Sequence, residues 1–286
     1  MFDCASTARR RIAEGRSQAF PIRQVQTFVV EGSNKPRRVP SIDWRTVSDE
    51  FVHAVHRFCR FHHVADGIPP SIKWPHHFFK DCEMNNPTLR HILGASNPNM
   101  LPAQTTALLV IDFQDEYFTG ALPIPNGAEV LRNAVSLVEH ADRNGWTVVH
   151  VVHVAPASAP IFAIDGSTVG IHRDILPKPA HRLVEKETVS VFASTDLAAS
   201  LKRDGITHVV ICGLMTHACV AGAARDAAPA GFEVVVAADA CATRDIVVDA
   251  QLRVSHDVLH RAALAEIADT FGAVMSTRDI LSLANR

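Results

Sequence analysis

The chain of 286 residues lacks the features that mark membrane, secreted and nucleic-acid-binding proteins. No apolar run approaches the roughly 18 residues that span a bilayer, and the arginines at positions 9–11 are not followed by the apolar core of a secretory signal. The formal net charge is only −2, so neither nucleic acid nor an anionic membrane is expected as a partner. These absences favour a protein that acts on a small molecule.

Disulfide scaffolding is also missing from the sequence. The six cysteines are scattered along the chain without a paired C-x-x-C spacing, at Cys4, Cys59, Cys82, Cys212, Cys219 and Cys241. So few and so widely spaced cysteines indicate a reducing compartment rather than a disulfide-stapled secreted domain. We therefore expect a cytoplasmic protein.

The composition changes near Met84. Residues 1–83 carry 13 Lys and Arg against 9 Asp and Glu, whereas residues 84–286 carry 15 against 21. The basic, His-rich head shows no sustained helix or strand period and does not resemble a domain. Six of its side chains could be considered as metal ligands, but their spacing matches no zinc module, so we favour no metal there. They are Cys59, His62, His63, His76, His77 and Cys82.

From residue 105 onward, apolar strands alternate with helix-prone segments. We expect strands at 106–111, 146–152, 183–185, 207–212, 232–238 and 273–275, and helices at 126–144, 195–204, 216–230, 255–271 and 277–284. A polar loop rich in Pro and Gly covers residues 155–180. Such alternation requires right-handed crossovers and a mostly parallel sheet. The sequence therefore predicts an α/β fold, a three-layer α/β/α sandwich around six strands.

Three chemically capable side chains fall at the carboxyl ends of these strands, where open parallel sheets bind ligands. Asp112 follows the first strand, Lys186 follows the third, and Cys219 lies at the start of the helix after the fourth. Each has an ordinary structural explanation, as a turn cap, a solvated charge or a core cysteine. Together they match what a nucleophilic cysteine needs, because the attack requires a base, a cation and donors for the oxyanion.

The setting of Cys219 favours the thiolate. A cysteine at a strand-to-helix junction is surrounded by unpaired backbone N–H groups and the positive end of the helix dipole. A thiolate is the nucleophilic form of cysteine. The alternative is a buried, inert thiol.

Three segments resemble the signature regions of the isochorismatase-like cysteine hydrolases in order and spacing. They are residues 108–114 (LLVIDFQ), 185–197 (EKETVSVFASTDL) and 212–220 (CGLMTHACV), and the resemblance covers about residues 85–283. It implies the six-stranded parallel sheet and a catalytic triad of Asp112, Lys186 and Cys219. It also implies a cis peptide bond at Leu214–Met215, an oxyanion hole made by the Met215 and Cys219 N–H groups, and a homo-oligomer, either a dimer or a tetramer.

The implied reaction is hydrolysis of a C–N bond in a small amide, carbamoyl or lactam substrate. Asp112 takes the thiol proton, Cys219 attacks the carbonyl, and water hydrolyses the resulting thioester. Three alternatives remain open. One is vinyl ether hydrolysis of the isochorismate type, although members with that activity typically lack the cysteine; the others are a non-catalytic binding scaffold and a reversible Cys212–Cys219 disulfide.

The resemblance also bears on cofactors and on the substrate pocket. Members that hydrolyse nicotinamide carry an Asp-x-His metal site after the second strand, where this chain has His150 and His153 without an intervening Asp. We therefore predict no metal and no cofactor, although these two histidines leave a metal site open. Eight side chains are candidates for the pocket, each of which could instead be loop or core packing. They are Gln114, Tyr117, Phe118, His153, Phe162, Phe192, Thr216 and His217.

Members of the subgroup with a similar nucleophile segment often begin with a sequence like that of residues 86–90, NPTLR. This makes Met84 a natural start. We accordingly expect residues 84–286 to be the hydrolase domain, and residues 1–83 to be an extension that is poorly ordered or absent from the native product.

Overall fold

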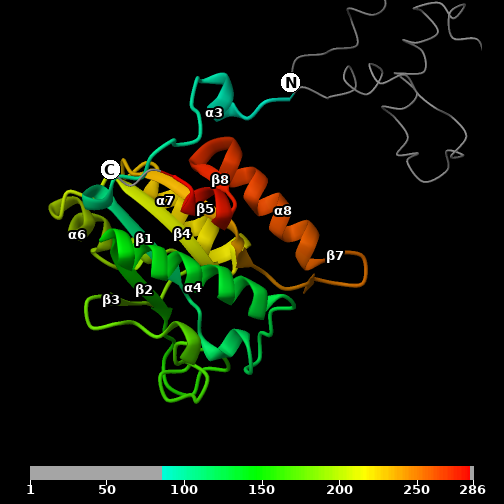
Figure 1. Ribbon diagram of the computed structural model, residues 1–286. Helices are drawn as coiled ribbons and strands as arrows, with labels where there is room; N and C mark the ends of the chain where they lie inside the picture. The colour runs from blue at the N-terminus through cyan, green and yellow to red at the C-terminus, as the bar shows by residue number, and fades with distance from the viewer. Residues whose placement is uncertain (1–85, 284–286) are drawn as a thin grey trace, which may run out of the picture. The chain divides into compact units, whose positions relative to one another are not determined.

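A computed structural model describes residues 86–283 of the chain. Six strands form one sheet in the order β3-β2-β1-β4-β5-β8, and every neighbouring pair is parallel (Figure 1). The strands are β1 Thr106–Ile111, β2 Thr147–His153, β3 Arg182–Lys186, β4 His208–Leu214, β5 Glu233–Ala242 and β8 Ala273–Met275. The predicted six-stranded parallel sheet is confirmed. The predictions for residues 1–83, including the metal-ligand set, lie outside the described residues.

Helices cover both faces of this sheet. The helices are α3 Leu89–Ile92, α4 Gly127–Asn144, α5 Val191–Ser194, α6 Leu197–Arg203, α7 Ala221–Ala227, α8 His256–Glu266 and α9 Thr277–Leu281. Short 3₁₀ turns lie at Ala103–Thr105, Asp115–Tyr117 and Arg173–Ile175, and π-helical turns at Thr216–Val220 and Ile267–Phe271. Helices α4 and α9 pack against one face, and α5 to α7 against the other (Figure 1). The three-layer α/β/α architecture is thereby confirmed.

The central strand β1 shows why this architecture suits the sequence. All six of its residues are buried, as expected for a strand covered on both faces. Helix α4 buries the apolar stripe that the 3.6-residue period predicts, and it ends at Gly145, which adopts the left-handed conformation with φ +71°. Strand and helix then pack through one continuous core.

Several predicted elements are divided or extended in the structure. The helix predicted at 195–204 forms as α6, and it begins at Leu197 because Thr195 is extended and its hydroxyl accepts a hydrogen bond from the Leu197 N–H at 3.2 Å. The short helix α5 before it was not predicted. The helices predicted at 216–230 and 255–271 each include a π-helical turn, the first before α7 and the second after α8. π-Helical turns are rare and often lie at functional sites.

Strand β5 runs four residues beyond its predicted end at 238. The polar Asp239 suggested the end of an apolar strand, but its carboxylate accepts hydrogen bonds from the N–H and hydroxyl of Thr277, and its carbonyl accepts one from Asn133. Because these groups satisfy Asp239, the strand continues to Ala242.

A two-stranded antiparallel hairpin, which the sequence did not predict, follows β5. It consists of β6 Ile246–Val247 and β7 Arg253–Val254, and it leads into α8 (Figure 1). Within residues 86–283, every helix is too short or too polar to span a lipid bilayer.

Candidate active site

The strand order reverses between β1 and β4, and open parallel sheets bind ligands beyond the carboxyl ends of their strands at such a point. Asp112 immediately follows β1 and adopts a left-handed conformation with φ +53°. Lys186 is the last residue of β3, and Cys219 lies in the π-helical turn after β4. A left-handed Asp is uncommon, and such strained backbone clusters at functional sites.

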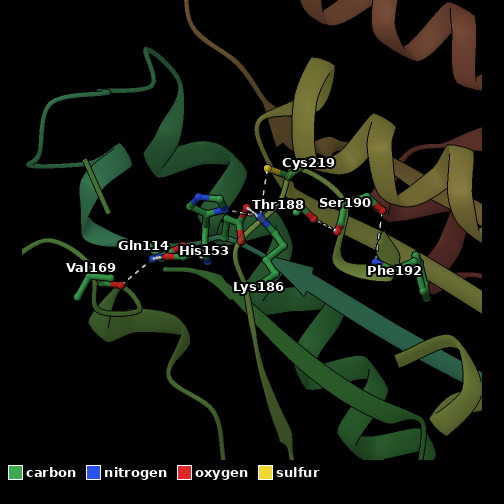
Figure 2. A network of polar contacts seen from close by, with 9 residues as sticks. Gln114, His153, Val169, Lys186, Thr188, Ser190, Phe192 and Cys219 are labelled. Carbon is green, nitrogen blue, oxygen red and sulfur yellow. Dashed lines mark hydrogen bonds and ion pairs between the residues drawn. The ribbon is translucent and has the colours of Figure 1, made fainter. Parts of the chain in front are cut away.

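The structure brings these three side chains together in a buried cluster. The Lys186 ammonium lies 2.8 Å from Asp112 Oδ2 and donates a hydrogen bond to Cys219 Sγ at 3.4 Å (Figure 2). Both charged side chains are fully buried, and Cys219 is 6% exposed. Asp112 Oδ1 has no hydrogen-bond partner among the described residues. An ion pair that contacts a thiol in a dry environment is the arrangement that proton transfer from sulfur requires.

Burial dominates the electrostatics of this cluster. It raises the pKa of Asp112 above its ordinary value, although the charge of Lys186 and its hydrogen bond oppose the shift. Burial and the negative charge of Asp112 also raise the pKa of Cys219 to about 12, against the lowering effect of Lys186. Since desolvation disfavours whichever form is charged, the resting thiol keeps its proton.

This result corrects the expectation that the setting of Cys219 favours a thiolate. Cys219 does not stand at the first residue of an α-helix, because a π-helical turn at Thr216–Val220 precedes α7. Desolvation and the neighbouring carboxylate outweigh the backbone dipoles and the ammonium. A reaction that uses this sulfur as a nucleophile would therefore need a proton transfer from it.

The turn between β4 and the nucleophile contains the other predicted backbone groups. The peptide bond Leu214–Met215 is cis. The Met215 carbonyl accepts hydrogen bonds from the N–H groups of Ala218 and Val220, at 3.1 and 3.3 Å. These bonds tie the π-helical turn to the end of β4, so Met215 and Cys219 belong to one compact loop.

Gln114 and His153 join the carboxyl ends of β1 and β2 beside the triad. The Gln114 amide donates to the carbonyls of His153 and Val169 and accepts from the His153 N–H, at 2.7 to 2.9 Å. His153 Nδ1 lies 3.1 Å from Lys186 Nζ (Figure 2). Burial and the charge of Lys186 lower the pKa of His153, so its neutral ring accepts a hydrogen bond from the ammonium. Backbone bonds occupy the amide of Gln114, whereas His153 touches the triad.

Aromatic side chains pack against His153 and extend the cluster beside the triad. The Phe162 ring contacts both Tyr117 and His153 edge-on, at centroid distances of 5.3 and 5.2 Å. Phe162 has φ +54°, which is a rare conformation for a bulky residue. Phe118 packs on His172 at 4.5 Å. The structure thus connects Tyr117, Phe162 and His153 to the triad.

The remaining pocket candidates lie in different surroundings. Thr216 is fully buried and its hydroxyl lies 2.8 Å from His260 Nδ1 on α8, while His217 Nδ1 lies 2.6 Å from Thr243 Oγ1. Phe192 instead stacks on Phe232, which lies just before the amino end of β5. Figure 2 shows the Phe192 ring pointing away from the triad. Phe192 is therefore the pocket candidate that the structure does not bring to the site.

Sequence reasoning missed Arg244. This half-buried residue follows β5 by two positions, and its charge adds to burial in lowering the pKa of His217. Its Nε is buried without a hydrogen-bond partner among the described residues. The sequence predicted that β5 ends at 238, which placed Arg244 inside a loop. Because β5 ends at Ala242, Arg244 lies near the carboxyl ends of the strands, where the triad residues also lie.

The two histidines of β2 do not form a metal site with each other. His150 Nε2 lies 3.1 Å from His181 Nδ1, whereas His153 contacts Lys186. Within residues 86–283, no group of three or more His, Cys, Asp or Glu side chains is arranged to hold a metal ion. Cys212 and Cys219 are both free thiols and belong to cores on opposite faces of the sheet, so the disulfide alternative has no support in this geometry.

Comparison with known proteins agrees with this geometry. Residues 106–279 match the model of the Isochorismatase domain. The chain is 38% identical to a secreted isochorismatase effector of Verticillium dahliae, over 68% of this chain and 98% of that protein. It is 34% identical to a streptothricin hydrolase of Streptomyces noursei, over 60% and 56%, and 27% identical to a maleamate amidohydrolase of Pseudomonas putida, over 61% and 84%.

Solved structures give the same result. The crystal structure of an isochorismatase from Pseudomonas putida superposes with a TM-score of 0.61 at 26% identity, covering 67% of this chain and 97% of that one.

Proposed function

The chain belongs to the isochorismatase family of hydrolases, and we propose that it hydrolyses the C–N bond of a small amide, carbamoyl or lactam substrate through a thioester on Cys219. The observation that carries the proposal is the buried contact of Lys186 with both Asp112 and the Cys219 sulfur. Relatives named as a streptothricin hydrolase and a maleamate amidohydrolase support hydrolysis of this kind.

The first half-reaction begins from the protonated thiol. Asp112 Oδ1, which has no other partner among the described residues, accepts the thiol proton as sulfur attacks the substrate carbonyl carbon. The C=O π electrons move to oxygen, and the N–H groups of Met215 and Cys219 are proposed to stabilise that oxyanion. Lys186 stays charged and offsets the negative charge that passes between carboxylate and sulfur.

The second half of the reaction returns the protons. Asp112 gives its proton to the departing nitrogen, the C–N bond breaks, and a thioester remains on Cys219. A water molecule, deprotonated by Asp112, then attacks the thioester carbonyl. The acid is released, and the proton returns to sulfur. No group outside the triad and one water is needed to balance these steps.

Product formation across a panel of small amides, carbamoyl compounds and lactams tests this proposal, with Cys219→Ala as the blank. The readout is ammonia release for the primary amides and carbamoyl compounds, and the mass of the ring-opened amino acid for the lactams. We expect at least one member to be hydrolysed, and the variant to lose on the order of 10⁴-fold in rate while keeping its fold. Full activity in Cys219→Ala would overturn the mechanism. Failure of the whole panel with intact protein would favour the non-catalytic scaffold.

The cellular setting remains part of the proposal. Three free thiols among the described residues are compatible with a reducing cytoplasm, whereas one relative is named as secreted. We propose a cytoplasmic homo-oligomer that acts on a small molecule without nucleic acid, membrane or cofactor. Fractionation of the native cell would test the location.

A further inference from the structure

The end of strand β2 is fixed to the end of β1 by a buried glutamine. Gln114 lies two residues beyond Asp112 and is completely buried. Its amide donates to the carbonyl of His153 at 2.9 Å and accepts from the N–H of the same residue at 2.8 Å. Its other amide proton goes to the Val169 carbonyl at 2.7 Å. The backbone of His153 is therefore held at a set position relative to the proposed base.

The pairing of β2 with β3 then places the His153 side chain beside Lys186. These two residues are partners in the parallel register of the strands. Side chains of partner residues on neighbouring strands project from the same face of a sheet. His153 Nδ1 accordingly lies 3.1 Å from Lys186 Nζ (Figure 2). The Phe162 ring, whose centroid is 5.2 Å from that of the imidazole, packs edge-on against it and holds it in place.

The Lys186 ammonium has one acceptor for each of its three N–H bonds. Nζ lies 2.8 Å from Asp112 Oδ2, 3.1 Å from His153 Nδ1 and 3.4 Å from Cys219 Sγ. Because an ammonium can only donate, Nδ1 must be unprotonated, and the neutral ring carries its proton on Nε2. Burial and the charge of Lys186 lower the pKa of His153, which keeps the ring in that neutral form.

Asp112 Oδ1 is the acceptor that this arrangement leaves open. It is buried and has no hydrogen-bond partner within residues 86–283. The other oxygen of the same carboxylate already contacts Lys186, so a small rotation would turn a free N–H of the ammonium towards Oδ1. A hydrogen bond donated to the charged form of a carboxylate makes it a weaker base. Occupying the third N–H elsewhere therefore protects the oxygen that is proposed to accept the thiol proton.

We propose that His153 is a positioning residue: by accepting the third N–H of Lys186, it keeps Asp112 Oδ1 open for the thiol proton. It acts through Lys186 and exchanges no proton with sulfur or substrate. Its effect on turnover rests on the proposed amide hydrolysis, whereas its effect on the deprotonation of Cys219 does not. Without His153, the ammonium donates twice to the carboxylate and the base is weakened.

Two variants of matched shape test the role of the acceptor. The side-chain oxygen of Asn stands the same number of bonds from the backbone as Nδ1 of His, whereas Leu has the shape of Asn without a polar atom. For His153→Leu we expect kcat to fall about 10- to 100-fold while KM changes by less than about threefold. His153→Asn should keep kcat within about threefold of wild type. Equal losses of kcat in the two variants would overturn the proposal, since lost packing would affect both alike.

His150 provides the matched control on the same strand. It precedes His153 by three residues and so projects from the opposite face of the sheet, where its ring stacks on His181. His150→Leu and His150→Asn should differ from each other by less than about twofold in kcat at neutral pH. A difference as large as that at position 153 would overturn the proposal, because the contact with Lys186 would then not be its cause.

Alkylation of Cys219 needs no turnover and separates this proposal from the proposed function. In the reaction with iodoacetamide, sulfur displaces iodide from carbon while the thiol proton passes to Asp112. Peptide mapping should show the rate at Cys219 reduced about tenfold in His153→Leu and within about threefold of wild type in His153→Asn. Equal rates in the two variants would overturn the role of His153. The expected difference in a protein that hydrolyses no amide would support that role, while the proposed function would fail.

Nitrogen NMR of histidine-labelled wild type tests the hydrogen bond itself, and it applies even where His153→Leu does not fold. The His153 signals are assigned by their loss in His153→Asn. At neutral pH we expect a neutral ring with its proton on Nε2 and an unprotonated Nδ1. A proton on Nδ1 would overturn the proposal, because that nitrogen could then accept nothing from Lys186.

Discussion

At the scale of single residues, the site depends on a buried pair of opposite charges. Lys186 and Asp112 are both completely buried and lie 2.8 Å apart. Taking two charges out of water is costly, and mutual attraction returns much of that cost only while both partners are present. We therefore expect the pair to serve the proposed chemistry of Cys219 rather than the stability of the fold.

This view predicts a specific pattern in a double-mutant cycle. Lys186→Met leaves the Asp112 charge unpaired and should lower the free energy of unfolding by about 3–5 kcal/mol. Adding Asp112→Asn should restore most of that loss, because Asn tolerates the left-handed backbone of position 112 and carries no charge. Urea unfolding measures both effects.

Activity provides the control for the cycle. The single and double variants should all be inactive, since each removes the base or the cation. Additive losses of stability in the double variant would contradict the paired-charge account.

The meeting of Asp112, Lys186 and Cys219 could be predicted from the sequence because each follows or ends a predicted strand, and the carboxyl ends of parallel strands share one edge of the sheet. Their proposed roles came from the family resemblance. Arg244 could not be predicted, because a polar Asp239 inside β5 concealed the end of that strand. The protonated state of Cys219 was also beyond reach, since it depends on the depth of burial and on the distance to Asp112.

At the scale of elements, Gly213 lets β4 turn towards the nucleophile. It has φ +146°, and a Cβ atom there would lie 2.2 Å from the Ile111 carbonyl oxygen. Rigid backbone of β1 occupies that space, so Gly213→Ala should destabilise the protein by about 3 kcal/mol or more. Gly231 provides the control, because its φ is +88° but no atom lies within 4 Å of a Cβ.

Gly231→Ala should cost only the strain of a left-handed residue, about 1–2 kcal/mol. Thermal or urea unfolding of the two variants compares them directly. Equal losses of stability at both positions would show that the contact with β1 does not matter.

A hydrogen-bonded relay joins three elements on the α4 face of the sheet. His181 Nε2 donates to Asp142 of α4 at 2.8 Å, while its Nδ1 accepts from the Lys178 N–H and from His150 Nε2 of β2, each at 3.1 Å. These partners assign the tautomers and leave the His150 ring neutral. The relay anchors the long loop before β3.

Burial lowers the pKa of His150 to about 4. Between the unfolded value near 6.5 and this lower value, the unfolded chain binds a proton that the native chain does not. Stability should therefore fall as the pH falls through this window, by up to about 3 kcal/mol from this residue.

Urea unfolding across that pH range, compared between wild type and His150→Gln, isolates the contribution. The variant should show a shallower loss of stability on acidification, because Gln keeps a donor and does not titrate. Parallel curves for the two proteins would contradict the assignment.

Element positions were predictable wherever periodicity decided them, as in β1 and α4. The interruptions were not, because they depend on partners distant in sequence or on local capping. Thr195 accepts a hydrogen bond from the Leu197 N–H and so shortens a predicted helix at its start, and Thr277 satisfies the Asp239 carboxylate that would otherwise end β5.

At the scale of the whole molecule, an exposed apolar surface adjoins the active-site edge. The hairpin and α8 expose Val247, Val248, Leu252 and Val258 by 49 to 65%. A two-stranded hairpin has little stability by itself, and contiguous apolar patches mark interaction surfaces. We expect copies of the chain to associate through this face.

Analytical ultracentrifugation tests that expectation. Wild type should sediment as a dimer or larger assembly, and Val248→Glu with Leu252→Glu should shift it towards the monomer. Leu183→Glu, on the edge strand β3 and equally exposed, should leave the assembly unchanged. A wild-type monomer at every concentration would contradict association.

The fold as a whole followed from the alternation of elements, whereas the hairpin did not, since its strands have only two residues each. Assembly depends on which surface of another molecule covers the exposed apolar side chains. The periodicity of a strand or helix in the sequence does not identify that surface.

The most direct test of the account is the mass of enzyme quenched with acid during turnover of an amide that the panel identifies. The account predicts an acyl increment on the peptide that contains Cys219, and its absence together with the loss of turnover in Cys219→Ala. Sustained turnover without an adduct on Cys219, and undiminished turnover in the variant, would contradict it.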